Sequence, residues 1–375
     1  MTAAAGRVLA RMDEELRSLW STPPPRGEPQ KARACTMNLV VVAATPALAD
    51  EWLPVVDAVI QNVPARALVI GLDPDAKDDF EGSVSAVCTP ADRGGGPLVC
   101  SERVKLVASG ALCDRLPSCV DALCATDVPL TLVWLARVHA ADPAFTPLAR
   151  QASRIVLDAT RGSLASLAHV VRWASQLAQE GRPGVADLAW TRLASWQELC
   201  ARMFDPIRLR PLSRQVTSVT LVQAASGGAG VATEGALLLG WLATRLGWKA
   251  SSLAGRLRLV RPDGGHVQVL LRAQAAPLVP PGTLIGVNVQ AGADDLSLRG
   301  EIERGGEGQT DAAIWRLQVT SGGRQEPALE QHTRLRGSDA ARLLERTLHR
   351  PPRDEALADA VGWADELRGE ELACT

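Results

Sequence analysis

The chain has 375 residues, 46% of them hydrophobic and 22% charged, and a formal net charge of −2. These are ordinary globular values, and they exclude a disordered chain, a collagen and a small disulfide scaffold. The near-neutral balance argues against the broad basic surface that nucleic acid requires, so we expect no nucleic-acid partner.

Residues 1–20 show the pattern of an amphipathic helix interrupted by charged residues. This pattern is unlike that of a signal peptide, and no apolar run in the chain reaches the roughly 18 residues of a membrane span. We therefore expect a cytoplasmic protein without a membrane partner. The segment Pro23–Pro29 is typical of a stiff linker, which makes residues 1–32 a first region.

Strands alternate with helices in the next region, residues 33–182. Continuous apolar runs predict buried strands, and further strands and helices are expected between them. The strands are 38–43, 66–72, 82–89, 101–108, 130–135 and 154–158, and the helices are 46–63, 111–125, 144–152 and 163–180. This alternation predicts an α/β, Rossmann-like domain with a mostly parallel sheet.

The pattern changes after a second helical stretch at about 186–204, and residues 183–210 are interpreted as a helical connector. From residue 211, apolar and polar residues alternate strictly, as in Val267, Val269 and Leu271. A period of two predicts an antiparallel sheet with one solvent-facing side. A strand is expected at 216–224, and helices at 233–246, 338–349 and 354–367. Residues 211–375 are therefore expected to form an α+β domain with C-terminal helices.

The eight cysteines are expected to be reduced thiols, mostly buried, as is usual in a cytosolic protein. Cys113, Cys119 and Cys124 form the one visible cluster. Their spacing differs from that of paired zinc ligands and no histidine is near, so burial is favoured over redox switching or metal binding. We expect no metal site.

Gly227–Gly230 lies between a predicted strand and a helix, which is the context of a phosphate cradle. The segment lacks the third glycine of the dinucleotide fingerprint, where Thr233 stands, and the Gly-Lys-Ser/Thr of a P-loop. A turn followed by Thr233 as the helix N-cap is the simpler interpretation. Neither His-Glu-x-x-His nor Gly-x-Ser-x-Gly occurs, so no catalytic set is predicted.

The segment Asp187–Trp196 carries two tryptophans six residues apart, an arginine and an acid. On a helix, Trp190 and Trp196 are about 120° apart, so one narrow stripe cannot bury both. Tryptophan and arginine dominate interface hot spots, so a partner surface is one interpretation. The interpretation that both tryptophans hold the two domains together is favoured over it.

This segment resembles the Asp-Leu-x-Trp-Thr-Arg-Leu-x-x-Trp signature of the glucose-6-phosphate dehydrogenase assembly protein family, OpcA. Further motifs follow in the family's order along residues 33–248. They are Arg33–Leu39, Pro64–Ala67, Cys100–Val104, Leu116–Ser118, Asp127–Trp134 and Trp241–Trp248. One departure is Gln197, where the family often has arginine.

The resemblance implies a non-catalytic factor that binds glucose-6-phosphate dehydrogenase, supports its active oligomer and raises its activity, without a cofactor. Some relatives couple this to thiol redox state, but no matching cysteine pair is visible. The residues implied for partner binding or the domain interface are Asp187, Trp190, Thr191, Arg192, Trp196, Trp241 and Trp248. The alternative is an enzyme or sensor that binds a nucleotide or sugar phosphate at Gly227–Gly230.

Overall fold

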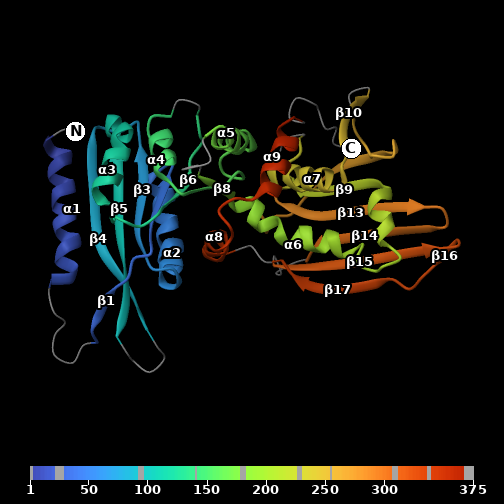
Figure 1. The fold of residues 1–375 in the computed structure, drawn as a ribbon, viewed down its shortest axis with the longest axis horizontal. Coiled ribbons are helices and arrows are strands. Elements are labelled where there is room, and N and C mark those ends of the chain that lie inside the picture. The colour runs from blue at the N-terminus through green and yellow to red at the C-terminus, as the bar shows by residue number, and fades with distance from the viewer. Residues whose placement is uncertain are drawn as a thin grey trace. The chain divides into compact units, whose positions relative to one another are not determined.

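A computed structural model describes residues 3–21, 29–91, 97–139, 142–177, 183–225, 230–253, 256–305, 311–335 and 339–366. The chain divides into two compact units (Figure 1). The first unit comprises Met1–Leu188 and Ala340–Asp354, and the second comprises Ala189–Asp339 and Glu355–Thr375. Within the described ranges, no helix has both the length and the apolar character needed to cross a bilayer.

The first unit contains an eight-stranded sheet with helices around it. Its strands are β1 (Lys31–Arg33), β2 (Met37–Ala43), β3 (Ala65–Asp73), β4 (Asp79–Pro90), β5 (Leu98–Ser109), β6 (Leu130–Leu135), β7 (Arg154–Leu157) and β8 (Gly184–Asp187). Its helices are α1 (Ala3–Ser21), α2 (Pro46–Asn62), the 3-10 helix η1 (Gly110–Arg115), α3 (Leu116–Leu123), α4 (Phe145–Gln151), α5 (Leu164–Ser175) and α8 (Ala340–His349).

The strand order of this sheet is β1-β5-β3-β2-β6-β7-β8, and β4 pairs with β5. All neighbouring strands are parallel except β4 and β5. The series β5-β3-β2-β6-β7-β8 has the 3-2-1-4-5-6 order of the doubly wound dinucleotide fold. The mostly parallel sheet predicted from the apolar runs is therefore confirmed.

Both faces of this sheet are covered, because its central strands are apolar along their whole length. All six residues of β6 are buried. One face packs against α2 and α8, with Trp52, Leu343 and Leu344 in the same buried cluster as Val41 and Val69. Helix α1 lies along β4 in Figure 1, and its Met12 is fully buried.

The second unit is built on a nine-stranded sheet. Its strands are β9 (Val216–Ala224), β10 (Lys249–Leu253), β11 (Arg256–Val260), β12 (His266–Gln274), β13 (Leu284–Ala293), β14 (Leu296–Arg304), β15 (Ala312–Ser321), β16 (Arg324–Gln325) and β17 (Leu329–Arg334). Its helices are α6 (Leu188–Arg202), the 3-10 helix η2 (Arg210–Gln215), α7 (Thr233–Leu246) and α9 (Glu355–Glu366).

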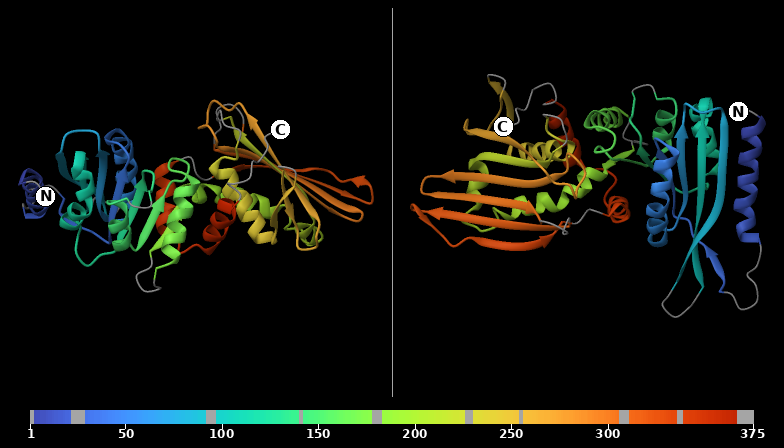
Figure 2. Two further views of the ribbon diagram at one scale, coloured as in Figure 1. Left: turned by 90° about the horizontal axis from the view of Figure 1, so that it is seen from above. Right: turned by 180° about the vertical axis from the view of Figure 1, so that it is seen from behind.

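The order in this sheet is β10-β11-β12-β9-β13-β14-β15-β16, with β17 on β15. Every second residue of β15 from Ala313 to Val319 is buried, so one face is covered and the other is open. Helices α6 and α7 lie on the covered face (Figure 2), where Trp315 Nε1 donates to Leu199 O at 3.0 Å. The predicted α+β unit with a one-sided sheet is confirmed, although β9 and β12 run parallel.

Several local expectations are corrected by the structure. The helix expected from residue 186 begins at Leu188, because Gly184–Asp187 pairs with β7 as strand β8. The helix expected at 111–125 is a 3-10 turn followed by α3. Thr233 is the first residue of α7 and not its N-cap, which is Ala232.

Candidate functional site

The tryptophan–arginine signature crosses the junction between β8 and α6. Asp187, the last residue of β8, is fully buried, and its Oδ2 accepts the N–H of Ala159 at 2.8 Å. Buried carboxylates require such donors, because an unsatisfied charge is costly away from water. Asp187 therefore fixes the end of β8, where α6 starts.

Both signature tryptophans are buried, Trp190 with 4% and Trp196 with 1% of its surface exposed. Thr191 between them is 2% exposed. The guanidinium of Arg304, at the end of β14, lies 5.9 Å from the centre of the Trp196 ring. This geometry is a cation–π contact between α6 and the sheet.

Arg192 extends this contact into a charged network. Its Nη1 donates to Glu234 Oε1 at 2.7 Å, and Glu234 Oε2 accepts the N–H of Leu284 at 2.9 Å. Leu284 O in turn lies 3.4 Å from Nε and Nη2 of Arg304. Burial lowers the pKa of Arg304, and the charge of Glu234 opposes that shift. The network thus joins α6, α7, β13 and β14.

The two tryptophans of the second-domain motif lie on and just after α7. Trp241 is half-buried, and Trp248 is 4% exposed. Gly247 ends the helix with φ of 69°, a left-handed conformation that glycine adopts without strain, and its N–H donates to Ala243 O. This turn sets the direction of the chain into Trp248.

A second polar cluster lies in the first unit and was missed by sequence reasoning. Glu102 is 1% exposed, and its Oε1 accepts Trp20 Nε1 at 2.6 Å. Its Oε2 accepts Arg66 Nε at 2.5 Å and Arg33 Nη2 at 3.2 Å. We call these four residues the Glu102 cluster.

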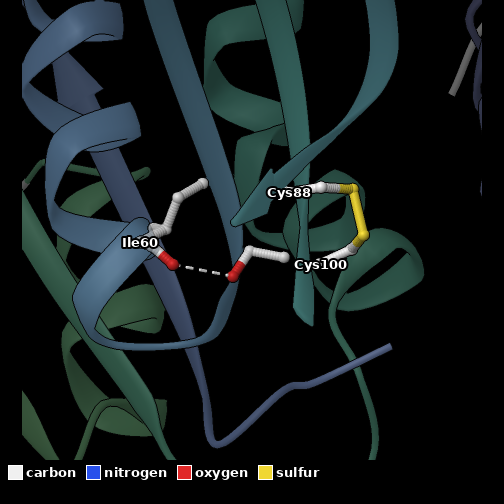
Figure 3. Close-up of a disulfide and its surroundings, with 4 residues drawn as sticks. Ile60, Cys88 and Cys100 are labelled. Atoms are coloured by element: carbon white, nitrogen blue, oxygen red, sulfur yellow. Dashed lines mark hydrogen bonds between the residues drawn. A yellow bond between two sulfur atoms is a disulfide. The ribbon is translucent and has the colours of Figure 1, made fainter. Parts of the chain in front are cut away.

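Ser101, next to Glu102, connects β5 to β3 and α2 through hydrogen bonds. Its Oγ accepts the N–H of Ala65 at 3.2 Å and donates to Ile60 O at 2.9 Å, the bond drawn to Ile60 in Figure 3. Three of the motifs that carry the family resemblance therefore meet at one place. The signal in the sequence is an acidic residue, Glu102, at a position in strand β5 that is almost fully buried.

The expectation that all cysteines are reduced is wrong for one pair. Cys88 and Cys100 form a disulfide (Figure 3). They stand directly opposite each other in the antiparallel pair β4–β5, with Cα atoms 4.0 Å apart. The pairing was not visible in the sequence, because it depends on the register of the two strands.

The predicted cysteine cluster is a set of free thiols. Cys113 and Cys119 are buried and Cys124 is half-buried. Burial raises the pKa of Cys119 to about 11 and that of Cys124 to about 12. Within the described residues, no group of three or more His, Cys, Asp or Glu is arranged to hold a metal ion.

The position at which the dinucleotide fold binds phosphate is the loop from β2 into α2. This loop, residues 44–45, contains no glycine, and Pro46 at the first helical position after it has no N–H to donate. Thr45 Oγ1 already accepts the N–H of Leu48 at 3.1 Å. The loop therefore lacks the glycine-rich backbone donors that hold a pyrophosphate.

The other phosphate candidate, Gly227–Gly230, lies outside the described residues except for Gly230. The side chain of the buried Gln223 forms two hydrogen bonds next to this segment. It donates to Gly230 O and accepts the N–H of Ala232, each at 2.9 Å. An amide side chain thus satisfies the start of α7 where a threonine cap was expected.

Two domains of one protein family match this chain, in the same order along the sequence. Residues 56–172 match the family described as the glucose-6-phosphate dehydrogenase subunit N-terminal domain, OpcA, and residues 183–361 match the corresponding C-terminal domain. The chain belongs to the OpcA family. The family expectation drawn from the signature and its accompanying motifs is therefore confirmed.

Two relatives carry the OpcA name as candidate OxPP cycle proteins. The protein of Nostoc punctiforme is 25% identical over 318 residues, which cover 82% of this chain and 66% of that protein. The protein of Synechocystis sp. is 25% identical over 319 residues, which cover 80% of this chain and 62% of that protein. The chain thus spans slightly less than two thirds of the length of these OpcA relatives.

Solved structures of oxidoreductases resemble this OpcA-family chain weakly. Levoglucosan dehydrogenase in complex with NADH gives a TM-score of 0.43 at 10% identity, covering 89% of this chain and 94% of that one. An oxidoreductase domain protein from Kribbella flavida gives 0.42 at 10% identity, with the same coverage. Similarity at this level supports no statement about function.

Proposed function

We propose that this protein is a non-catalytic factor that binds glucose-6-phosphate dehydrogenase in the cytoplasm, promotes its active oligomer and raises its activity. The observation that carries the proposal is the match, in order, of both domains that bear the name of that enzyme's subunit. The β2–α2 loop supports it, because Thr45 and Pro46 replace the glycine-rich cradle of a dinucleotide enzyme.

An activator of this kind needs no chemistry of its own. It must bind the active form of the enzyme better than the inactive form, since that difference alone shifts the equilibrium. Coupling free energies between sites are typically about 1–3 kcal/mol, which corresponds to roughly 5–150-fold in affinity. A surface of ordinary size on either unit can supply such a difference.

We assign different roles to the signature residues. Trp190, Thr191 and Trp196 are buried, so we propose that they act as positioning residues, together with Asp187, Arg192 and Trp248. Trp241 is half-buried on α7, one turn before the exposed Arg245. We propose that Trp241 contacts the enzyme, because it is partly exposed and tryptophan is enriched at interface hot spots.

The test is to titrate the purified protein into glucose-6-phosphate dehydrogenase from the same organism. We expect a saturable change in catalytic rate or apparent substrate affinity, together with co-elution on a sizing column. The titration is run with and without a thiol reductant, because Cys88–Cys100 is a disulfide here. No change in activity and no co-elution in either condition would refute the proposed function.

Two variants separate contact from positioning. Trp241→Ala is expected to raise the protein concentration needed for half-maximal activation about tenfold. This is a moderate loss of affinity for a hot-spot residue, since some hot-spot residues contribute more. Ile207→Ala is the matched control, because Ile207 is 80% exposed yet lies outside the signature motifs. Equal effects of the two substitutions on half-maximal activation would contradict the proposal that Trp241 contacts the enzyme.

A further inference from the structure

Strand β17 forms one edge of the sheet in the second unit, seen at the lower side of that sheet in Figure 1. It pairs with β15, and among the residues that the structure describes no strand pairs with its other side. Five of its six residues are exposed, the pairing with β15 has no bulge, and β17 contains no proline. An edge strand with these properties is a template for a further strand.

The register of β15 shows which of its backbone groups face β17. In an antiparallel sheet, the N–H and C=O of successive residues point alternately to the two neighbouring strands. Ala312 O accepts the N–H of Gly305, which follows β14, at 2.7 Å. Asp311 O, just before β15, accepts the N–H of Leu335, which follows β17, at 2.6 Å. The odd-numbered residues of β15 therefore direct their backbone groups to β17.

The even-numbered residues of β17 direct their backbone groups outward. They are Glu330, His332 and Arg334, because the odd-numbered residues stand opposite the odd-numbered residues of β15. Each offers one N–H donor and one C=O acceptor at the edge. Their side chains lie on the open face of the sheet, since Ile314, in register with His332, alternates with the buried residues of β15. Three donor–acceptor pairs are thus available to a further strand.

The charges on this edge have opposite signs at its two ends. Glu330 Oε2 accepts Nε of Arg316 at 2.7 Å, and Glu330 Oε1 lies 3.3 Å from Nε2 of His332. Arg334 is exposed, and its side chain has no hydrogen bond or ion pair with any residue in the described part of the chain. Charges protect an edge against pairing unless they meet charges of the opposite sign.

A second copy of β17 meets that condition when it runs antiparallel with His332 on a twofold axis. The outward residues then stand opposite one another, and each such pair exchanges two hydrogen bonds. Glu330 of each copy stands opposite Arg334 of the other, so opposite charges meet at both positions on the same face. Sliding the register by two residues in either direction loses one of the three hydrogen-bonded pairs and both of these charge pairs.

We propose that β17 pairs with β17 of a second copy of this chain, antiparallel and centred on His332, so that their two sheets become continuous. The occupant is a second copy because the edge is complementary to itself in hydrogen bonding and in charge, as an isologous interface requires. One strand pair is a small interface, and interfaces below about 1,200 Å² are typical of weak association. We therefore expect dimerisation at micromolar concentrations. This self-association goes beyond the proposed function and does not rest on it.

Sedimentation equilibrium of the full-length protein over a hundredfold range of micromolar concentrations measures the association. We expect an equilibrium between one and two chains, and Arg334→Glu should weaken dimerisation at least tenfold because carboxylates then meet at both positions. Arg272→Glu is the matched control, since Arg272 is exposed on the same face but on the interior strand β12. A parent protein that stays monomeric, or equal dimerisation of the two variants, would overturn the proposal.

Glu330→Arg supplies the complementary change of charge. Alone it should also weaken dimerisation at least tenfold, because two guanidinium groups then meet at each position. An equimolar mixture of Glu330→Arg and Arg334→Glu should dimerise, since each mixed dimer again joins opposite charges. Circular dichroism establishes that each variant is folded, and if Glu330→Arg is not, the comparison of Arg334→Glu with Arg272→Glu still decides the proposal. A mixture of folded variants that stays monomeric would contradict the pairing.

A cysteine on the twofold axis tests the register. Residues of a hydrogen-bonded antiparallel pair have Cα atoms about 5.5 Å apart, within the range that a disulfide spans. His332→Cys should therefore give a disulfide-linked dimer under mild oxidation, which peptide mass spectrometry assigns to position 332. Gln331→Cys is the control, because residue 331 stands opposite Thr333 of the second copy and not opposite itself. Absence of the crosslink at position 332, or equal crosslinking of both variants, would overturn the register.

Discussion

Glu102 illustrates how a single residue can organise the edge of a sheet. Its two carboxylate oxygens receive donors from Trp20 on α1, Arg33 on β1 and Arg66 on β3. Such a cluster need not be more stable than an apolar one, but removing Glu102 leaves Arg66, whose side chain is 12% exposed, without its counter-charge. The cluster therefore specifies where α1 and β1 meet the sheet.

Replacing Glu102 with glutamine should accordingly be costly. We expect Glu102→Gln to lower the free energy of unfolding by about 3 kcal/mol, the lower range for breaking a buried ion pair. The measurement is chemical denaturation followed by circular dichroism. Glu81→Gln is the control, because Glu81 is exposed on the neighbouring strand β4. A Glu102→Gln midpoint equal to that of the control would contradict the assigned role.

The free cysteines differ from one another in burial and hence in reactivity. Burial raises the pKa of Cys200 to about 12 and that of Cys119 to about 11, from the usual 9.0. Only the thiolate reacts with alkylating reagents. At pH 8 the native protein should therefore be modified at the half-buried Cys35, while Cys119, Cys124 and Cys200 resist iodoacetamide.

The same shifts predict a loss of stability in alkali. A thiol whose pKa is higher in the folded chain stays neutral there while the unfolded chain ionises, so folding is favoured less as pH rises above about 9. Mass spectrometry of the alkylated protein checks the reactivity, and denaturation between pH 8 and 10.5 checks the stability. Alkylation of native Cys200 as fast as that of Cys35 would contradict both expectations.

At the scale of elements, the packing of α7 against α9 depends on a glycine. A Cβ atom on Gly240 of α7 would lie 2.4 Å from the backbone oxygen of Ala360 on α9. Helices approach this closely only where one of them lacks a side chain. The helix expected at 233–246 has the bounds of α7, but the sequence did not predict this contact.

Gly240→Ala should therefore destabilise the protein although alanine is the better helix former. We expect a loss of about 1–3 kcal/mol from overpacking. Gly362→Ala on α9 is the matched control: nothing lies within 4 Å of its added Cβ, so a gain of about 0.5–1 kcal/mol is expected from helix propensity alone. Thermal unfolding measures the stability change of each variant, and we expect the two changes to have opposite signs. A Gly240→Ala variant that is more stable than the parent protein would refute the close-packing argument.

At the scale of the whole molecule, the first unit is completed by residues from near the end of the chain. Helix α8 packs on α2, with Leu343 2% exposed and Leu344 fully buried. Arg154 on β7 donates to the carbonyl oxygens of Thr347, Leu348 and Arg350, at 2.6 to 2.7 Å. Thr347 and Leu348 lie in the last turn of α8, whose carbonyls have no partner within the helix, and Arg350 is the residue that follows the helix.

Arg154→Met should loosen α8 without unfolding the unit. We expect amide hydrogen exchange in residues 340–349 to rise at least tenfold, because three carbonyls lose their donor and a cation leaves the negative helix end. Arg154→Lys keeps the charge with fewer donors. Its exchange rate in residues 340–349 should lie between those of the parent protein and Arg154→Met. Exchange that is unchanged in Arg154→Met would show that apolar packing on α2 alone holds the helix.

The sequence predicted those parts of the candidate site that depend on local pattern. It identified the signature segment, and the structure buries Trp190 and Trp196 on α6. It could not predict that Arg192 reaches Glu234, or that Arg304 lies over Trp196, because these partners are 42 and more residues away along the chain. The Glu102 cluster was missed for the same reason.

The class of each unit was determined by the sequence alone, because the period of the apolar residues is a property of neighbouring positions. Continuous runs gave buried parallel strands, and alternation gave a one-sided sheet. The tertiary structure alone decided the Cys88–Cys100 bond, the return of α8 to the first unit and the outward-facing edge of β17. Each of these depends on strand register or on contacts between distant segments, which local periodicity does not encode.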